Sequence, residues 1–348
     1  MQPPQTLLAL TLALPALSLL AGGARADDLT VISFGGAVQK AQEKAYYEPF
    51  SKETGIKVIA GEYNGEQAKI KAMVEAHNVT WDVVEVESAE LYRGCEEGIY
   101  QELDYSKIGD KKDFLPKAVS DCGVGTFVWS TVLAYDADKL KTPPTSWADF
   151  WDVKTFPGKR GLRKGAKFTL EIALLADGVK PDDVYKVLAT KEGVERAFKK
   201  LDQIKPHIQW WEAGAQPPQM LAAGDLVMSS AYNGRIATAQ GEGKNLKIVW
   251  NGSIYDADHW AIPTGTPKLE QAYKFIAYAS RPGPQQVYSS EITYGPTNLK
   301  AVEGLDPKRV ANLPTAPQNL QGALASNTQF WVEHGEELEQ RFNAWAAK

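Results

Sequence analysis

Short apolar runs alternate with helical patterns in the first part of the chain. The run at 29–34 (LTVISF) is typical of a strand and ends at Gly35-Gly36, after which apolar positions recur at helical spacing. Two further strands are predicted at 57–63 and 82–87, and a helical pattern follows each of them. This alternation predicts a mostly parallel sheet with helices on both faces.

The predicted sheet indicates a first group of candidate site residues. In open α/β sheets, ligands bind beyond the carboxyl ends of the strands. The residues predicted at those ends are Phe34, Gly35, Gly36, Glu87 and Ser88. We therefore expect this group to line a ligand site.

A change of composition in the middle of the chain indicates a second lobe. The β-type run at 126–135 (TFVWSTVLAY) has Trp129 and Ser130 at its centre, and Pro143-Pro144 follows it. Strands predicted at 247–250 and 259–262 return across the lobes. Two lobes also agree with a length of 348 residues, because single cores stop growing at ~250–300 residues.

Each lobe is expected to be built from two separate parts of the chain. The first lobe is predicted to contain 27–135 plus 256–300, and the second 136–255 plus 301–348. Each is expected to be a mostly parallel sheet flanked by helices. The short segments that join the lobes are hinge candidates.

The N-terminal segment has the pattern of an export signal. An apolar run at 7–21 leads into Ala24-Arg25-Ala26, and it is shorter than the ~20 residues that a membrane-spanning helix needs. The pattern predicts a signal peptide at 1–26 and a periplasmic location. A core helix is the alternative, but the run has no polar face.

Two cysteines, Cys95 and Cys122, lie outside the predicted signal peptide. In an exported chain, an even number of cysteines predicts a disulfide. Two buried free thiols are the alternative. A metal pair is disfavoured because no histidine is near in sequence.

Charge and motifs exclude several classes of function. The net charge is −5 without a basic block, which argues against nucleic acid as a partner. Phosphate-binding loops, dinucleotide fingerprints and H-E-x-x-H motifs are missing from the sequence, and its four histidines lie far apart. We therefore expect no metal site and no cofactor.

Aromatic and acidic residues recur together near the predicted crossings between the lobes. Trp129 lies near the first crossing, and Tyr255, Asp256, Asp258 and Trp260 lie near the return. Aromatic faces and carboxylates together suit an organic ammonium group. Core packing is the alternative for any one of these aromatic residues.

Several segments, taken in order, resemble the periplasmic spermidine/putrescine-binding proteins of ABC importers. They are 50–58 (FSKETGIKV), 81–84 (WDVV), 145–149 (TSWAD), 232–234 (YNG), 261–263 (AIP) and 294–299 (YGPTNL). The resemblance implies a two-lobed periplasmic binding protein fold, the type II flytrap. It also implies a cleft that closes on a small solute, and delivery of that solute to a membrane permease.

The resemblance also implies roles for individual residues. Tyr232 and Tyr294 stand at positions of cleft aromatic residues, Asp258 stands at the amine-binding aspartate, and Phe330-Trp331 replaces a ligand-contacting stretch. The segment 163–168 (RKGAKF) departs from the family, because it carries three basic residues where polyamine binders have acids. A second ammonium group would meet positive charge there.

The departure favours a ligand with one cationic end and one neutral or anionic end, such as a γ-amino acid. Asp258, with Asp256 or Glu87, is expected to hold the ammonium group, and Arg163 or Arg235 to hold a carboxylate. If the basic segment only flanks the cleft, diamines stay possible.

The predicted function is that of a solute-binding component of an ABC importer, acting as a monomer. An exported enzyme and a sensory binding subunit with the same fold are the alternatives. The candidate ligand-binding residues are Phe34, Gly36, Glu87, Ser88, Trp129, Ser130, Arg163, Tyr232, Arg235, Asp256, Asp258, Tyr294 and Trp331.

Overall fold

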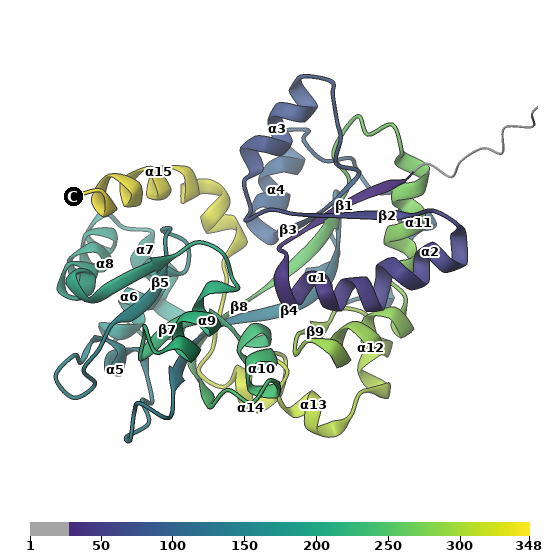
Figure 1. Cartoon of the computed structure of the whole chain (residues 1–348). Helices are drawn as coiled ribbons and strands as arrows, with labels where there is room; N and C mark the ends of the chain where they lie inside the picture. Colours follow the sequence, from purple (N-terminus) through teal and green to yellow (C-terminus); the bar gives the residue numbers. More distant parts are fainter. Residues whose placement is uncertain (1–27) are drawn as a thin grey trace, which may run out of the picture.

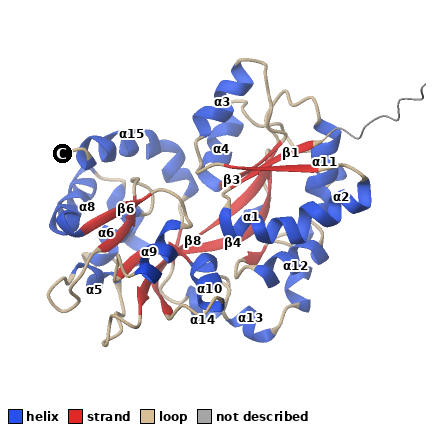
Figure 2. Ribbon diagram, viewed as in Figure 1, coloured by secondary structure: helices blue, strands red, loops and turns tan. Residues whose placement is uncertain are grey.

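The computed structural model describes residues 28–348, so the predicted signal peptide at 1–26 lies outside the described residues. Two lobes are joined in the middle by the long strands β4 (Gly123–Asp136) and β8 (Leu246–Ala261) (Figure 1). Helices surround the strands of both lobes (Figure 2). The predicted two-lobed α/β fold is confirmed.

The first lobe begins with the predicted parallel strands. β1 (Leu29–Ser33) pairs with β2 (Val58–Glu62) on one side and with β3 (Val83–Glu87) on the other. Gly35 and Gly36 both have left-handed φ, of 63° and 59°, which explains why glycines end β1. The helices of this part are α1 (Gly36–Gln42), the π-helix η1 (Glu43–Tyr47), α2 (Glu48–Thr54), α3 (Gln67–Glu75) and α4 (Ser88–Glu96).

The strands β4 and β8 run antiparallel to each other at the centre of the sheet. The strand order is β2-β1-β3-β8-β4-β7-β5-β6, so both lobes share these two strands. Their pairing shifts register between Gly125 and Phe127 and again between Thr131 and Leu133. Each lobe is therefore parallel at its edge and antiparallel where it meets the other lobe.

The second lobe is built on three short parallel strands. They are β5 (Arg160–Arg163), β6 (Ile208–Trp211) and β7 (Met228–Tyr232), with β5 in the middle. Its helices are α5 (Trp147–Trp151), α6 (Thr169–Ala176), α7 (Val184–Leu188), α8 (Lys191–Ile204), α9 (Gln216–Ala223) and α10 (Asn233–Gly241).

The rest of the chain returns to the first lobe and then ends on the second (Figure 1). The helices and strands after β8 are α11 (Leu269–Ala279), α12 (Pro282–Glu291), β9 (Gly295–Pro296), α13 (Pro307–Ala311), α14 (Pro317–Leu320), β10 (Leu324–Ala325) and α15 (Thr328–Ala346). Short 3-10 helices occur at Tyr105–Lys107, Lys111–Asp113, Pro116–Ala118, Pro181–Asp183, Lys205–His207 and Leu299–Gly304.

One predicted break is wrong. The sequence pattern predicts separate strands at 247–250 and 259–262, but β8 is continuous from Leu246 to Ala261. The polar residues in its middle resemble a loop in sequence. They are tolerated in a central strand because they find partners: Ser88 Oγ donates a 2.7 Å hydrogen bond to Asp256, and Trp129 Nε1 donates one of 2.6 Å to Asp258.

The predicted lobe boundaries fall inside elements of the structure. Position 135 lies near the end of β4, position 255 lies within β8, and position 300 lies within the 3-10 helix Leu299–Gly304. The boundaries stay predictions. The chain passes between the lobes within β4 and β8 rather than in a loop at those positions.

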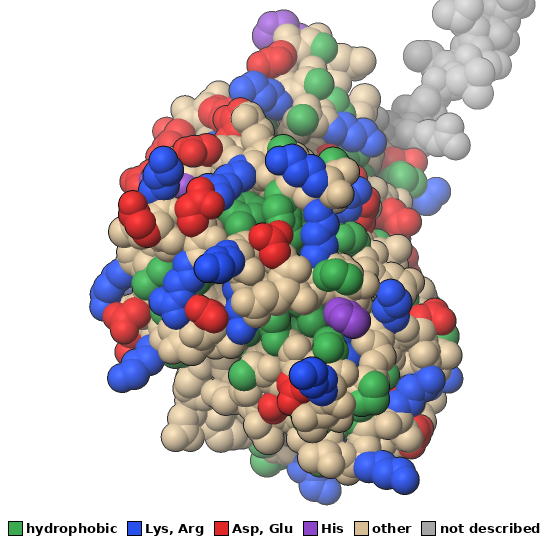
Figure 3. Space-filling model, turned by 90° about the vertical axis from the view of Figure 1, so that its left-hand side faces the viewer, with side chains coloured by type: hydrophobic (Ala, Val, Ile, Leu, Met, Phe, Trp, Pro, Cys, Tyr) green, Lys and Arg blue, Asp and Glu red, His purple; other side chains and the backbone are tan. Residues whose placement is uncertain are grey.

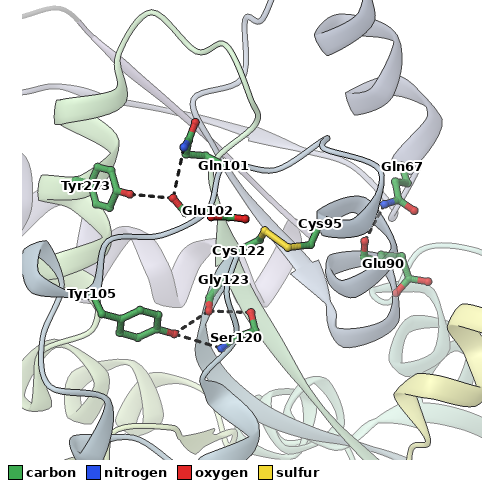
Figure 4. The surroundings of a disulfide bond; sticks show 10 residues. All are labelled: Gln67, Glu90, Cys95, Gln101, Glu102, Tyr105, Ser120, Cys122, Gly123 and Tyr273. Atoms are coloured by element: carbon green, nitrogen blue, oxygen red, sulfur yellow. Dashed lines mark hydrogen bonds between the residues drawn. A yellow bond between two sulfur atoms is a disulfide. The ribbon is translucent and has the colours of Figure 1, made fainter.

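The predicted disulfide between Cys95 and Cys122 is confirmed. It joins the end of α4 to the residue before β4 and closes a sequence separation of 27 residues. Tyr105 Oη donates a 2.9 Å hydrogen bond to the carbonyl of Gly123 beside it (Figure 4). The bridge therefore fixes α4 against the start of a strand that both lobes share.

Charged side chains of both signs occur on the surface. Basic and acidic side chains are interspersed on the face that Figure 3 shows, without a large area of one sign. Among residues 28–348, no helix has the length and apolar character needed to cross a membrane.

Candidate ligand-binding site

A cavity lies between the lobes, at the carboxyl ends of β1 and β3. Its walls come from both lobes and from the shared strands β4 and β8. The lining residues are Phe34, Val38, Asn64, Glu85, Glu87, Phe127, Trp129, Arg163, Glu212, Gly214, Tyr232, Arg235, Asp258 and Tyr294.

The structure brings many of the sequence-predicted residues together in this cavity. They come from positions up to 260 residues apart in the chain. The predicted residues that line it are Phe34, Glu87, Trp129, Arg163, Tyr232, Arg235, Asp258 and Tyr294.

Five predicted residues do not line this cavity. Ser88 and Asp256 bond to each other and face a separate cavity beside β8. Ser130 is buried, and its backbone N–H donates to the Asn233 side chain. Trp331 is buried in the second lobe, where its indole N–H donates a 2.7 Å hydrogen bond to a carboxylate oxygen of α6. Gly36 lines a neighbouring groove.

Some lining residues were not predicted. They are Val38, Asn64, Glu85, Phe127, Glu212 and Gly214. Glu85 had a signal in the sequence, because it lies two residues before Glu87 on the same strand and therefore shares its face. The others lie on elements whose approach to the cleft depends on the tertiary fold.

The acidic end of the cavity holds the carboxyl groups of Asp258 on β8 and Glu85 on β3. Trp129 Nε1 donates to Asp258 Oδ1 at 2.6 Å, and the amide of Gln42 donates to Glu85 Oε2. Burial raises the pKa of Glu85 to about 7. Burial, with the negative charge of Glu85 beside it, raises the pKa of Asp258 well above its usual value. This end therefore favours a cation.

Aromatic rings form the walls next to these carboxyl groups. Trp129 meets Tyr232 edge to face, with ring centroids 5.1 Å apart and planes at 89°. Tyr294 stacks on Phe127 at 4.9 Å, and Phe34 stacks on Tyr63 at 5.1 Å. Such rings hold an organic ammonium group through their faces and exclude water from it.

The basic segment of the second lobe pairs with acids of the first. Arg163 Nη1 lies 3.4 Å from Glu87 Oε1, and Lys167 Nζ lies 2.7 Å from Glu87 Oε2 and 2.9 Å from Glu90 Oε2. Burial alone would raise the pKa of Glu87, but the two cations beside it lower that pKa below its usual value. The basic residues of 163–168 are therefore partly neutralised by acids of the opposite lobe.

Arg235 joins the lobes a second time. Its Nη2 donates to the Phe34 carbonyl at 2.8 Å, and its Nη1 donates to the Gly35 carbonyl at 3.2 Å. A Cβ at Gly36 would lie 2.8 Å from Arg235 Nη1, so glycine is needed for this approach. Arg235 Nε is buried without a partner among the described residues, which leaves one donor of the guanidinium group free.

The residues that line the cavity are chiefly acidic, basic and aromatic. Among the described residues, those that line the cavity include no serine, cysteine or histidine. His259 is buried, and its Nε2 lies 3.2 Å from the carbonyl of Lys117. The described part of the chain also holds no cluster of side chains able to bind a metal ion.

Known proteins with similar sequences are solute-binding proteins. The chain is 64% identical over 329 residues to a γ-aminobutyric acid-binding protein of Pseudomonas aeruginosa, covering 94% of this chain and 93% of the relative. It is 26% identical over 312 residues to the spermidine/putrescine-binding periplasmic protein of Escherichia coli, covering 86% and 87%. These relatives confirm the predicted resemblance and the periplasmic location.

Structural similarity leads to the same group. A solved GABA receptor superposes with a TM-score of 0.82 at 38% identity, covering 92% of this chain and 98% of the receptor. The family model for bacterial extracellular solute-binding proteins matches residues 45–318. The chain therefore belongs to the bacterial extracellular solute-binding protein family.

Proposed function

We propose that this protein binds γ-aminobutyrate between its lobes and delivers it to an ABC permease in the inner membrane. It acts as a monomer and leaves the solute chemically unchanged. The ligand's ammonium group lies at Asp258 and Glu85 among the aromatic rings. Its carboxylate lies toward Arg163 and Arg235.

The observation that carries this proposal is the placing of opposite charges in one cavity. Two acidic residues, Asp258 and Glu85, and two basic residues, Arg163 and Arg235, all line it. A γ-amino acid has its two charges at opposite ends and matches this arrangement. The 64% identity to a γ-aminobutyric acid-binding protein supports the same ligand.

A diamine fits this cavity less well. Its second ammonium group would face a guanidinium group, and two like charges at 4 Å repel by about 4 kcal/mol at an effective dielectric constant near 20. Glu87 offsets part of this repulsion, but its two oxygens are already paired with Arg163 and Lys167.

Isothermal titration calorimetry with γ-aminobutyrate, putrescine, spermidine and α-amino acids tests the proposal. We expect γ-aminobutyrate to bind roughly 100-fold more tightly than putrescine, a difference of about 2.7 kcal/mol. Putrescine binding as tightly as γ-aminobutyrate would contradict the proposed ligand.

Two variants test the orientation of the ligand. Arg163→Met is expected to weaken γ-aminobutyrate binding roughly 100-fold while weakening putrescine binding less, because only the former carries a carboxylate. Asp258→Asn is expected to weaken both. Lys186→Met is the control, because Lys186 is an exposed cation of the second lobe outside the cavity.

A further inference from the structure

Two carboxyl groups that line the cavity lie on the same face of the sheet, with too few donors for both to be ionised. Asp258 lies opposite Glu87 in the pairing of β8 with β3, so it is the diagonal neighbour of Glu85 on the same face. Glu85 is completely buried and Asp258 is 4% exposed. Two neighbouring carboxylates that both carry charge repel strongly in such a setting.

The neighbouring donors satisfy only part of this pair. Trp129 donates to Asp258 Oδ1, and Gln42 donates to Glu85 Oε2. Glu85 Oε1 is buried and accepts no hydrogen bond from the described residues. Their diagonal positions on neighbouring strands bring the two carboxyl groups onto one face of the sheet, within reach of each other. A hydrogen bond between two carboxyl groups needs a proton on one of them.

We propose that Glu85 and Asp258 share one proton when the site is empty, and that the ligand's ammonium group displaces this proton into solvent when it binds. The inference rests on the proposed function, because it requires a cationic group at this end of the cavity. The exchange is balanced in charge: one positive charge enters the pair and one proton leaves it. Binding of the solute is therefore coupled to the release of a proton.

The other groups around the pair do not exchange protons near neutral pH. Arg163 stays charged, and the cations beside Glu87 keep it ionised; Arg235 is the other basic residue that lines the cavity. The pKa values of the surrounding tyrosines are raised, chiefly by burial; these tyrosines are Tyr46, Tyr47, Tyr63, Tyr232, Tyr288 and Tyr294. Burial lowers the pKa of His259 to about 4, so it is neutral there. Raised pKa values of Glu85 and Asp258 agree with a proton held by this pair.

The coupling has a defined sign. Below about pH 7 the empty pair holds the proton, so the ligand must displace it and binding weakens as pH falls. Release of one proton per ligand corresponds to a tenfold weaker affinity for each pH unit in this range. Above that range the pair has lost its proton, and the affinity no longer changes with pH.

Calorimetric titration of the whole protein with γ-aminobutyrate at pH 6.0, in buffers of different ionisation enthalpy, measures the released protons directly. We expect close to one proton per ligand at pH 6.0 and almost none at pH 8.5. Tight binding at pH 6.0 without proton release would overturn the inference. Absence of γ-aminobutyrate binding at pH 8.5 would instead overturn the proposed function, so the two failures are distinguishable.

Two matched variants identify the source of the proton. Glu85→Gln removes one partner of the pair and keeps the size of the side chain, and we expect the release at pH 6.0 to fall at least twofold. Glu171→Gln is the control, because Glu171 is equally buried and its pKa is also raised to about 7, but it lies outside the cavity. Equal proton release by wild type and Glu85→Gln would overturn the assignment of the proton to this pair. If the variant does not fold, the wild-type titration still tests the coupling.

Discussion

The ammonium group of Lys167 lies 2.7 Å from the carboxylate of Glu87, across the cleft between the lobes. Both side chains are nearly buried, with exposed fractions of 9% and 7%. A buried ion pair contributes little relative to an apolar contact, but removing one partner leaves an uncompensated charge and costs about 3–5 kcal/mol. The two residues belong to different lobes. Removing one of them therefore destabilises the closed arrangement of the lobes.

Lys167→Met is therefore expected to favour the open arrangement. Glu87 and Glu90 would lose their shared cation, and opening would let water solvate them. We expect ligand affinity to fall at least tenfold and the radius of gyration of the unliganded protein, measured by small-angle scattering, to increase. Lys164→Met is the neighbouring control, because its pair with Glu212 is exposed and contributes about 0–1 kcal/mol. Equal effects of the two variants would refute this role of Lys167.

Gly36→Ala is expected to disturb the other contact between the lobes. The φ of Gly36 is 59°, a region that costs a residue with a Cβ about 1–2 kcal/mol, and the new Cβ would press against Arg235 Nη1. We expect a lower melting temperature and weaker ligand binding. Gly283→Ala is the control, because a Cβ there meets no atom within 4 Å. Unchanged affinity in Gly36→Ala would show that Arg235 is not held by this turn.

Glu171 makes stability depend on pH. Burial raises its pKa from 4.5 to about 7, although Trp331 and Tyr185 donate hydrogen bonds to it. The folded state keeps this proton at pH values where the unfolded chain has lost it. The contribution of Glu171 to stability is therefore present below about pH 4.5 and is lost as pH rises toward 7, by about 3 kcal/mol at most.

Urea denaturation of Glu171→Gln at pH 5 and pH 8 measures this effect. We expect the variant to lose less stability than wild type between these two values. Some pH dependence is expected to stay, because Glu85 and Asp258 act in the same direction. The exposed replacement Glu192→Gln should behave as wild type, and a wild-type slope in Glu171→Gln would contradict the prediction.

Removal of the disulfide should lower stability without affecting the ligand. The bridge closes a separation of 27 residues, for which the chain-entropy model gives about 3–4 kcal/mol. Neither cysteine lines the cavity. We expect the Cys95→Ser/Cys122→Ser double variant to have a lower urea midpoint and an unchanged dissociation constant for γ-aminobutyrate at 25 °C. A large loss of affinity in the folded double variant would contradict this prediction, because it would show that the position of α4 affects ligand binding.

Local patterns in the sequence were enough to predict how the first lobe begins. The apolar run of β1, the glycine pair after it and the following helix are determined by neighbouring residues, and all three occur as predicted. The same local reasoning failed for β8, where polar residues in the middle resemble a loop. Their partners, such as Ser88 for Asp256, lie 168 residues away in the chain.

The candidate site shows the same division. Glu87 and Asp258 were found from strand ends and from the family resemblance, because each has a signal at its own position. The pairing of Glu87 with Lys167 joins residues 80 positions apart, and no local pattern encodes it. Trp331 was selected by its position in the family, but its indole is occupied by Glu171 in the interior of the second lobe.

The two long shared strands have a consequence for how the protein folds. Because β4 and β8 each supply strand positions to both lobes, neither lobe has a complete sheet of its own. A fragment cut at a lobe boundary would expose the unpaired edge of a central strand. The protein should therefore unfold in a single cooperative calorimetric transition, and the lobes that move apart to admit a solute should not be separable as independently stable domains.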